Sequence, residues 1–242
     1  MTPPQRPPRR PCIVVGVTMP TPRLVRIVAQ GELADWPEPG PAAHVKLFLP
    51  DTPVGPVMRT YTVRDWDRER QAVTIDMALN DGAGPATQWA SRVVPGMRLE
   101  LSGRSRSSFA VPQRGGRYLF AGDETALPAI TTCLASLPAQ VKAKALIEVA
   151  DAADQQPLLT NAELSLRWLY RELGEPGLAT ALLASVVEFK PDQIWLACEA
   201  GVMRSIRRAL LDQGFPAECL QTHGYWRRGE SNHPDHDTGE DA

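Results

Sequence analysis

Apolar and polar positions change their spacing once along the chain, near residue 112. From Ile13 to Val111 the apolar residues form short runs rich in β-branched side chains, and Pro, Gly and Asp separate these runs. The runs lie at residues 13–17, 24–30, 44–50, 59–66, 72–79 and 97–103. Short strands at this spacing predict an N-terminal six-stranded antiparallel β-barrel.

From Arg117 onward, strand-like runs alternate with stretches of helical spacing. We expect strands at residues 117–122, 145–150 and 193–200, and helical stretches at 127–137, 164–170 and 202–214. This alternation predicts a C-terminal α/β nucleotide-binding domain with a parallel sheet. Pro112 and Gly115-Gly116 place the boundary between them, so the expected domains are residues 11–114 and 115–229.

The two ends of the chain differ in composition from these domains. Residues 1–10 are rich in Pro and Arg and hold nothing apolar that could offset the cost of ordering, so we expect a disordered basic arm. Residues 230–242 carry acidic side chains without an apolar partner, which predicts an acidic disordered tail. His233 and His236 lie in this tail, and we expect solvated side chains there rather than metal ligands.

Composition excludes several function classes. The 242 residues include 26 Lys and Arg against 28 Asp and Glu, a net charge of −2, which removes the electrostatic case for a general nucleic-acid or membrane-surface binder. The 4 cysteines lie far apart without a CxxC pair, so neither a zinc site nor a disulfide scaffold is expected. No apolar run approaches the ~18 residues of a membrane span. We expect a monomeric cytoplasmic protein without a metal site.

The first segment that could take part in ligand binding is Arg59-Thr-Tyr61-Thr-Val63-Arg. On a strand, Arg59, Tyr61 and Val63 share one face, and the intervening residues share the other. An aromatic ring and a guanidinium on one face would suit a flavin, since the ring stacks and the cation pairs with a phosphate. The hexapeptide alone fits an ordinary exposed strand equally well.

Two further segments begin helices. Residues 81–90 (DGAGPATQWA) place a Gly turn before Pro85 and Thr87, which leaves backbone N–H groups available to an anion, although many helices begin this way. Residues 122–130 (GDETALPAI) follow an expected strand and precede a helix, where an open α/β sheet binds nucleotides. Asp123 or Thr125 could equally serve there as a simple N-cap.

The last two segments lie near the C-terminal end. Residues 195–204 (WLACEAGVMR) again run from a strand end into a helix, and Cys198 is either a small core residue or a ligand contact. Residues 223–229 (HGYWRRG) place two large aromatic side chains side by side. Either ring could fill the core.

Taken together, these segments resemble the siderophore-interacting proteins, also called ferric-siderophore reductases, within the ferredoxin-reductase-like flavoproteins. RTYTVR, GPATQWA, GDETALPAI and GYWRRG carry the resemblance, which spans roughly Cys12 to Gly229. The chain departs from the family pattern at Asn80, where the family has His, and at Cys198, where Gly is usual.

The resemblance implies a bound FAD and a nicotinamide donor. Arg59 would contact the pyrophosphate, Tyr61 would pack against the isoalloxazine and Thr62 would bond near flavin N5. The implied FAD contacts are Arg59, Tyr61, Thr62, Val63, Arg64, Asn80, Gly84, Pro85, Ala86, Thr87, Trp89, Thr125 and Trp226. The implied NAD(P)H contacts are Gly122, Asp123, Glu124, Glu148, Cys198, Glu199 and Gly201.

The choice between NADH and NADPH depends on charge near the ribose. Glu148 or Asp151 could accept the ribose 2′-OH and repel a 2′-phosphate, which favours NADH. Arg167 and Arg171 could attract the phosphate instead.

The implied activity passes electrons from NAD(P)H through FAD to the Fe(III) of a ferric siderophore and releases Fe(II), with the flavin carrying the chemistry. A net charge of −2 cannot steer an anionic complex, so we expect a local basic rim. Its candidates are Lys46, Arg104, Arg106, Arg227 and Arg228. The alternatives are a ferredoxin-like or haem-protein reductase with another one-electron acceptor, and a non-catalytic siderophore-binding module.

Overall fold

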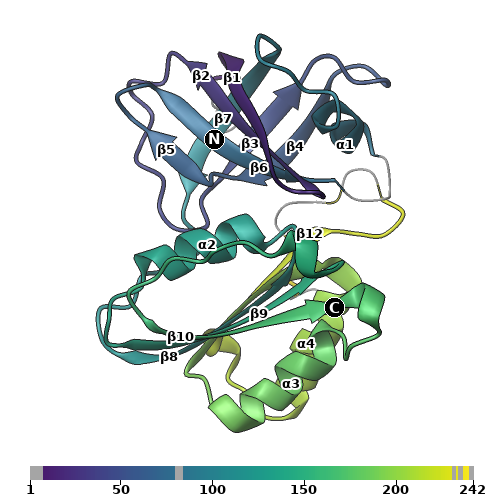
Figure 1. The fold of residues 1–242 in the computed structure, drawn as a ribbon. Coiled ribbons are helices and arrows are strands. Elements are labelled where there is room, and N and C mark those ends of the chain that lie inside the picture. Colours follow the sequence, from purple (N-terminus) through teal and green to yellow (C-terminus); the bar gives the residue numbers. More distant parts are fainter. Residues whose placement is uncertain (1–7, 80–83, 231–232, 234–236, 240–242) are drawn as a thin grey trace, which may run out of the picture. The chain divides into compact units, whose positions relative to one another are not determined.

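The computed structural model describes residues 8–79, 84–230, 233 and 237–239, without the side chains of residues 104–106. The chain divides into two compact units, Met1–Ala110 and Val111–Ala242. This division precedes Pro112, whereas the expected domains meet between residues 114 and 115. Figure 1 shows the elements of both units.

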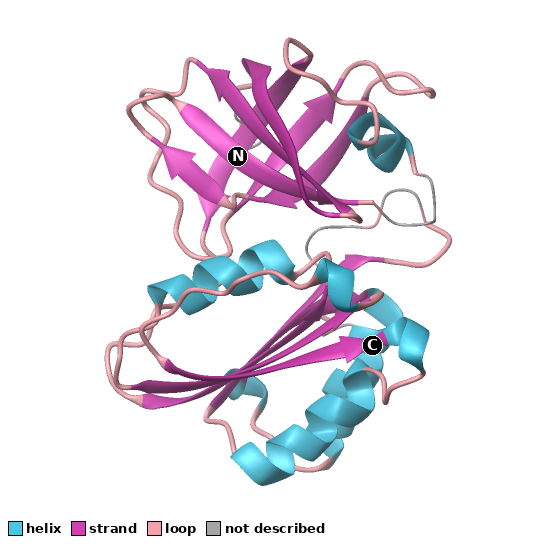
Figure 2. Ribbon diagram, viewed as in Figure 1, coloured by secondary structure: helices cyan, strands magenta, loops and turns pink. Residues whose placement is uncertain are grey.

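The first unit is built around one antiparallel sheet with strand order β4-β3-β7-β1-β2-β6-β5 (Figure 2). Its elements are β1 (Arg10–Thr21), β2 (Leu24–Gly31), β3 (His44–Leu49), β4 (Val57–Thr62), β5 (Asp65–Asp67), β6 (Ala72–Ala78), α1 (Pro85–Ala90) and β7 (Arg98–Arg106). All six predicted strands are present. The single run predicted at residues 59–66 divides into β4 and the short β5, because Val63 N–H turns away to Ala43 O and Arg64 N–H to Thr74 O.

The core of the first unit follows the alternation of its strands. Ile27, Leu47, Ile75 and Leu101 are 0% exposed, and the indole of Trp89 fixes α1 in the same cluster. Close packing of such apolar side chains supplies the main stabilisation of a small β unit.

The predicted N-terminal arm is wrong at its last residues. Strand β1 begins at Arg10, whose guanidinium binds the carboxylate of Asp35, and Arg9 Nη1 lies 3.3 Å from Glu100 Oε2. Residues 1–7 lie outside the described part of the chain.

The second unit contains a five-stranded parallel sheet of order β10-β9-β8-β11-β12. Its strands are β8 (Gly116–Asp123), β9 (Val141–Val149), β10 (Glu163–Tyr170), β11 (Gln193–Glu199) and β12 (Leu220–Trp226). Its helices are α2 (Leu127–Ser136), α3 (Leu178–Phe189) and α4 (Ala200–Asp212), with short 3-10 turns η1 (Ala152–Asp154), η2 (Arg171–Leu173) and η3 (Ala217–Cys219). Helix α2 covers one face of the sheet, and α3 and α4 cover the other (Figure 1).

The helical prediction for residues 164–170 is wrong, because these residues form the edge strand β10. Leu164 and Trp168 fit a helical spacing, yet Leu164, Leu166 and Trp168 also fit the alternation of a strand. Pairing with β9 along the whole of β10 decides between the two. Helix α3 and strand β12 were not assigned from the sequence.

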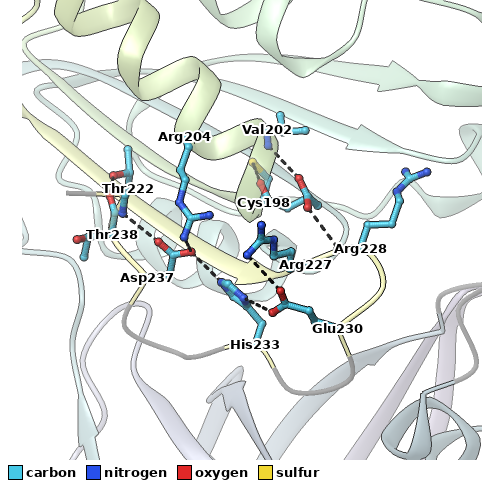
Figure 3. A network of polar contacts seen from close by, with 12 residues as sticks. Cys198, Val202, Arg204, Thr222, Arg227, Arg228, Glu230, His233, Asp237 and Thr238 are labelled. Atoms are coloured by element: carbon cyan, nitrogen blue, oxygen red, sulfur yellow. Dashed lines mark hydrogen bonds and ion pairs between the residues drawn. The ribbon is translucent and has the colours of Figure 1, made fainter. Parts of the chain in front are cut away.

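The described residues after Glu230 return to the body of the second unit. Gly224 N–H donates to Asp237 O at 2.7 Å, and the Thr222 hydroxyl donates to Thr238 O. The side chain of His233 is only 5% exposed and lies 2.8 Å from Asp237 Oδ2 (Figure 3). The predictions of a solvated His233 and a solvated tail are therefore wrong at these residues, because residues on β12 and α4 bind Asp237 and Thr238, and Glu230 and Asp237 bind His233. His236 lies outside the described residues.

In the part of the chain that the structure describes, no helix is long and apolar enough to cross a membrane. The same residues contain no group of three or more His, Cys, Asp or Glu that could hold a metal ion.

Candidate functional site

The pairing of β4 with β3 shows which residues of the Arg59 segment share a face. Tyr61 lies opposite Val45, and Arg59 lies opposite Leu47. Both β3 partners belong to the core of the unit. Because directly opposed residues of an antiparallel pair lie on one face, Arg59 and Tyr61 share the core-directed face, as their spacing predicts.

Both side chains are in partly desolvated surroundings. Burial raises the pKa of Tyr61 to about 12, against the opposing effect of the Arg59 charge. Burial also lowers the pKa of Arg59, whose Nη1 donates to Met58 O at 2.8 Å. A guanidinium whose charge is less well stabilised than in water gains from an anionic ligand. The pair therefore fits an aromatic ligand that carries a phosphate, as FAD does.

The residues after Tyr61 take separate roles. Thr62 is 7% exposed, and Val63 is 4% exposed and packs into the core instead of presenting its side chain to a ligand. Arg64 Nε lies 3.8 Å from Asp76 Oδ2, and Arg26 binds the same carboxylate at 2.6 and 2.8 Å. Burial lowers the pKa of Arg64. Asp76 therefore fixes the direction of the Arg64 side chain.

Helix α1 follows the second predicted FAD segment. Its N-cap is Gly84, without a side-chain cap, and Pro85 is at its first turn. Ala86 and Trp89 are buried in the core, a location that favours a structural role for both. Gly84, Pro85 and Thr87 remain partly accessible. Asn80 lies outside the described residues.

Lys46 lies on the opposite face of β3 from Val45. It pairs with Thr60 on β4 and with Ser102 on β7, and its Nζ donates to the Thr60 hydroxyl at 2.8 Å. Of the other rim candidates on this unit, Arg106 pairs in register with His44, and Arg104 lies on the same strand β7. Lys46 thus shares a polar face with Thr60, while Arg59 and Tyr61 occupy the other face.

In the second unit, Asp123 is the centre of the predicted nucleotide site. Its side chain is 5% exposed at the carboxyl end of β8. Oδ1 accepts from Thr125 N at 3.0 Å and from the Thr125 hydroxyl, and Oδ2 accepts from Glu199 N at 3.1 Å and Trp226 Nε1 at 2.8 Å. Burial and the charge of Glu124 raise the pKa of Asp123 to about 6, against the hydrogen bonds from Thr125 and Trp226.

Gly122 allows the end of β8 to lie close to Ala126 and to Ala197 on β11. A Cβ at this position would lie 2.5 Å from Ala126 Cβ and 2.5 Å from Ala197 O, so no side chain fits. Strands β8 and β11 are neighbours at this point, and the connections turn in opposite directions from them. This is the switch point at which open α/β sheets bind nucleotides.

Glu199 and Cys198 end β11. Glu199 Oε2 accepts from Val202 N at 2.9 Å and so caps α4, and a Cβ on Gly201 would lie 3.0 Å from the same oxygen. Cys198 is 1% exposed within the core, and burial raises the pKa of its thiol. These surroundings favour the core role for Cys198.

Glu124 and Glu148 both pair with the guanidinium of Arg171. Arg171, which follows β10, donates to Glu124 from both terminal nitrogens at 2.8 Å and to Glu148 Oε1 at 3.5 Å. Glu148 Oε2 also accepts from Leu178 N at 2.8 Å, at the start of α3. The carboxylate predicted to bind ribose is therefore already bound to protein groups. Asp151 Oδ1 likewise accepts from Ala153 N at 2.7 Å.

The last rim candidates follow β12. Arg227 Nη1 lies 3.1 Å from Glu230 Oε1, and Arg228 N donates to Glu199 Oε1 at 3.3 Å. Figure 3 shows Arg227 beside Glu230, the Arg228 side chain directed away from Glu230 and His233, and Arg204 reaching Asp237 from α4. Sequence reasoning missed the Asp123–Trp226 bond, which joins residues 103 positions apart, and the pairing of Arg204 with Asp237 at 2.6 Å. No local pattern signals contacts of such separation.

Comparison with known families and structures places this geometry in a class. The family model described as siderophore-interacting FAD-binding domain matches residues 53–107. A ferredoxin reductase in carbazole 1,9a-dioxygenase, in its FAD apo form, is 16% identical and has the same fold, with a TM-score of 0.75 over 90% of this chain and 68% of that one. The barrel-like sheet and the parallel sheet together give the chain a ferredoxin-reductase-like fold, and the matched part of the first unit resembles a siderophore-interacting FAD-binding domain.

More similar proteins narrow the class to a family. The model described as siderophore-interacting protein matches residues 116–229. The crystal structure of a siderophore utilization protein from T. fusca is 31% identical, with a TM-score of 0.83 over 96% of this chain and 97% of that one. The chain belongs to the siderophore-interacting protein family.

Curated relatives differ in length from the chain. The mycobactin import ATP-binding/permease protein IrtA of Mycolicibacterium smegmatis is 28% identical over 90% of this chain, which spans only 26% of that protein. Ferric vibriobactin reductase ViuB of Vibrio cholerae is 26% identical over 88% of this chain and 88% of its own length.

Proposed function

We propose that this protein is a flavin-dependent ferric-siderophore reductase. It takes electrons from NAD(P)H through FAD to Fe(III) bound by a siderophore and releases Fe(II) for iron assimilation. The observation that carries the proposal is the partly desolvated Arg59 beside Tyr61 on β4, within the residues that match a siderophore-interacting FAD-binding domain. Similarity to ferric vibriobactin reductase along most of both chains supports the substrate class.

Residues of the first unit would hold FAD. The Arg59 guanidinium would donate charge-assisted hydrogen bonds to the diphosphate, and the Tyr61 ring would lie against the isoalloxazine. Asp76 would keep Arg64 in place, and Thr62 would offer its hydroxyl beside the ring. When bound, FAD supplies the step from a two-electron donor to a one-electron acceptor.

The second unit would bind the nicotinamide nucleotide at the carboxyl ends of β8 and β11. Gly122 admits close approach there, and Glu199 fixes the first turn of α4. NADH is the donor that the charges favour, because Arg171 is bound to Glu124 and Glu148 and the three side chains together carry a negative charge. A 2′-phosphate would be repelled there.

Ferric siderophores are held by hard oxygen ligands, which bind Fe(II) much less strongly than Fe(III). Reduction alone therefore releases the metal, and one nicotinamide nucleotide supplies electrons for two ferric complexes. Lys46 on the polar face of β3 would attract an anionic complex. Free thiols at Cys12, Cys133, Cys198 and Cys219 suit a reducing compartment, so we place the reaction in the cytoplasm.

An anaerobic titration tests the proposal. The purified protein, loaded with FAD, is mixed with NADH or NADPH and then with one catecholate and one hydroxamate ferric siderophore. We expect bleaching of the flavin absorbance by the nucleotide, its return on adding the siderophore, and ferrous iron captured by a chelating dye. Bleaching without ferrous iron would point to a different one-electron acceptor. Siderophore binding without any bleaching would indicate a binding module and refute the reductase.

A further inference from the structure

The Asp123 carboxylate joins three strands of the second unit. It lies at the end of β8, and its Oδ2 binds the backbone N–H of Glu199 at the end of β11 and the indole N–H of Trp226 at the end of β12. Its Oδ1 binds Thr125 twice, at the turn into α2. One buried side chain thus connects the turns into α2 and α4 with the last residue of β12.

The donors around Asp123 require a carboxylate. The N–H groups of Thr125, Glu199 and Trp226 can only donate, and the Thr125 hydroxyl alone could reverse its role. The two groups that bind Oδ2, the N–H of Glu199 and the indole N–H of Trp226, can only donate. An amide nitrogen at the position of Oδ2 would face two N–H groups and would leave both without an acceptor.

Burying this carboxylate costs free energy, because the group loses its hydration and only hydrogen bonds from its protein partners can compensate for the loss. An apolar residue would pack between β8 and β11 at lower cost. What the carboxylate adds is direction, since it fixes an indole ring and a helix start in one relative arrangement. Trp226 is only partly buried, so without this bond water could take its N–H and the ring would be free to turn.

We propose that Asp123 is a positioning residue of the nicotinamide site: through Oδ2 it fixes the Trp226 indole and the start of α4 in the arrangement that receives the nucleotide. Asp123 transfers no proton or electron in this role. The inference rests on the proposed use of a nicotinamide donor. It adds a specific route, in which Asp123 affects the affinity for the nucleotide through its hydrogen bond with the Trp226 indole.

The test compares two variants that break the same hydrogen bond from opposite ends. Asp123→Leu keeps the approximate size of the side chain and removes both acceptor oxygens, whereas Trp226→Phe keeps an aromatic ring and removes the donor. Trp195→Phe is the matched control. Trp195 is 2% exposed on β11, and its indole nitrogen has no hydrogen-bond partner among the described residues. The control therefore loses an indole N–H that holds nothing.

Two measurements are made on the FAD-loaded protein. The first is the indole N–H resonance of Trp226 in a ¹H–¹⁵N spectrum, assigned by its loss in Trp226→Phe. The second is the NADH concentration that gives half-maximal anaerobic flavin reduction, with NAD⁺ affinity measured by calorimetry as a readout independent of electron transfer.

We expect the Trp226 resonance in Asp123→Leu to move to the position of a water-exposed indole and to exchange faster. Both variants should raise the half-saturating NADH concentration about tenfold, which corresponds to about 1.4 kcal/mol. The limiting rate at saturation should change less than the half-saturating concentration. The double variant should need no more NADH than Asp123→Leu alone, because Asp123→Leu already removes the hydrogen bond to the indole that Trp226→Phe removes. Trp195→Phe should behave as wild type.

An unmoved Trp226 resonance in Asp123→Leu, or additive effects in the double variant, would overturn the inference. So would an unchanged half-saturating concentration in a variant whose resonance has moved. If Asp123→Leu does not fold, the comparison of Trp226→Phe with Trp195→Phe decides alone, and equal NADH requirements refute the route. If wild type shows neither flavin reduction nor NAD⁺ binding, the proposed donor is wrong, and the resonance arm still reports whether Asp123 holds the indole.

Discussion

Arg171 donates from both terminal nitrogens to Glu124, at 2.8 Å each, and the same guanidinium lies 3.5 Å from Glu148. Two carboxylates thus engage Arg171, a cation that could otherwise attract a 2′-phosphate at the ends of β8, β9 and β10. The cation is present, but its charge is more than balanced by its neighbours.

Glu124→Gln should therefore relax the preference for NADH. Removing one negative charge leaves Arg171 paired with Glu148 alone, so we expect kcat/KM for NADPH to rise about tenfold relative to NADH, a shift of about 1.4 kcal/mol. Steady-state rates with both nucleotides measure this ratio. Glu163→Gln is the control, since Glu163 pairs with Lys142 at the opposite end of β10. A ratio that moves equally in both variants would contradict the role of Arg171.

Arg59→Ala should weaken FAD binding. The diphosphate would lose a charge-assisted partner that contributes about 1.5–3 kcal/mol, or roughly 10- to 150-fold in Kd. Flavin retained after extended dialysis and a fluorescence titration with FAD give the two readouts. Arg68→Ala, at an exposed arginine of the same unit, should retain FAD like wild type. Full flavin occupancy in Arg59→Ala would show that the phosphate contact lies elsewhere.

Lys46→Glu should raise KM for an anionic ferric siderophore while leaving flavin reduction by NADH unchanged. The effect should be largest at low ionic strength and should fade as salt screens the charge over about 10 Å at 0.1 M. Steady-state iron release at two salt concentrations measures it. Arg70→Glu reverses a charge that is 81% exposed on the same unit and provides the control. Equal KM values in the two variants at low salt would remove Lys46 from substrate binding.

Asp237 should stabilise the second unit at neutral pH and lose this effect in acid. Although burial opposes it, bonds from His233, Gly239 N–H and Arg204 lower the pKa of this carboxyl. A lowered pKa in the folded state means that the stabilisation is complete above the unfolded pKa of about 4 and disappears as the pH falls through the folded value. Urea unfolding of wild type and Asp237→Asn should differ at pH 7 and converge in acid. Asp212→Asn, at the end of α4, should show no such convergence.

Asp123 should give the free energy of unfolding the opposite pH dependence. Its pKa is raised to about 6 by burial, so between about pH 4 and pH 6 the folded protein holds a proton that the unfolded chain has lost. The free energy of unfolding should therefore fall as the pH rises through this window. The difference between wild type and Asp123→Asn, measured by urea unfolding at several pH values, should carry this slope. A flat difference would mean that the carboxyl titrates as it does in water.

Much of the fold could be predicted because its local patterns agree with its pairing. The six strand runs of the first unit and the strand-to-helix turns at Gly122 and Glu199 all follow from residues close together in the sequence. The same holds for the shared face of Arg59 and Tyr61. The prediction failed at the edge strand β10, because a short run such as LSLRWLY fits both the helical and the strand period. Only pairing with its neighbour β9 selects between them.

The site could be predicted by residue type more fully than by contact. Asp123, Glu124 and Trp226 stand out in the sequence through the family resemblance, but their partners do not. Glu148 is the clearest case, since it has the expected charge and place yet accepts from Leu178 N and Arg171. Such long-range partners are set by how β8, β9 and β10 lie beside one another, which spacing along the chain does not encode.

The return of residues 237–239 onto β12 has a consequence for colloidal behaviour. An edge strand with open N–H and C=O groups is a template on which other copies of a chain can add and aggregate. At β12, Asp237 O accepts the Gly224 N–H, and a Cβ on Gly224 would lie 2.9 Å from Asp237 Oδ2, so a side chain at residue 224 would have to displace the Asp237 carboxylate. A substitution such as Gly224→Val would therefore open this edge, and its first symptom would be loss of solubility at high protein concentration rather than loss of turnover.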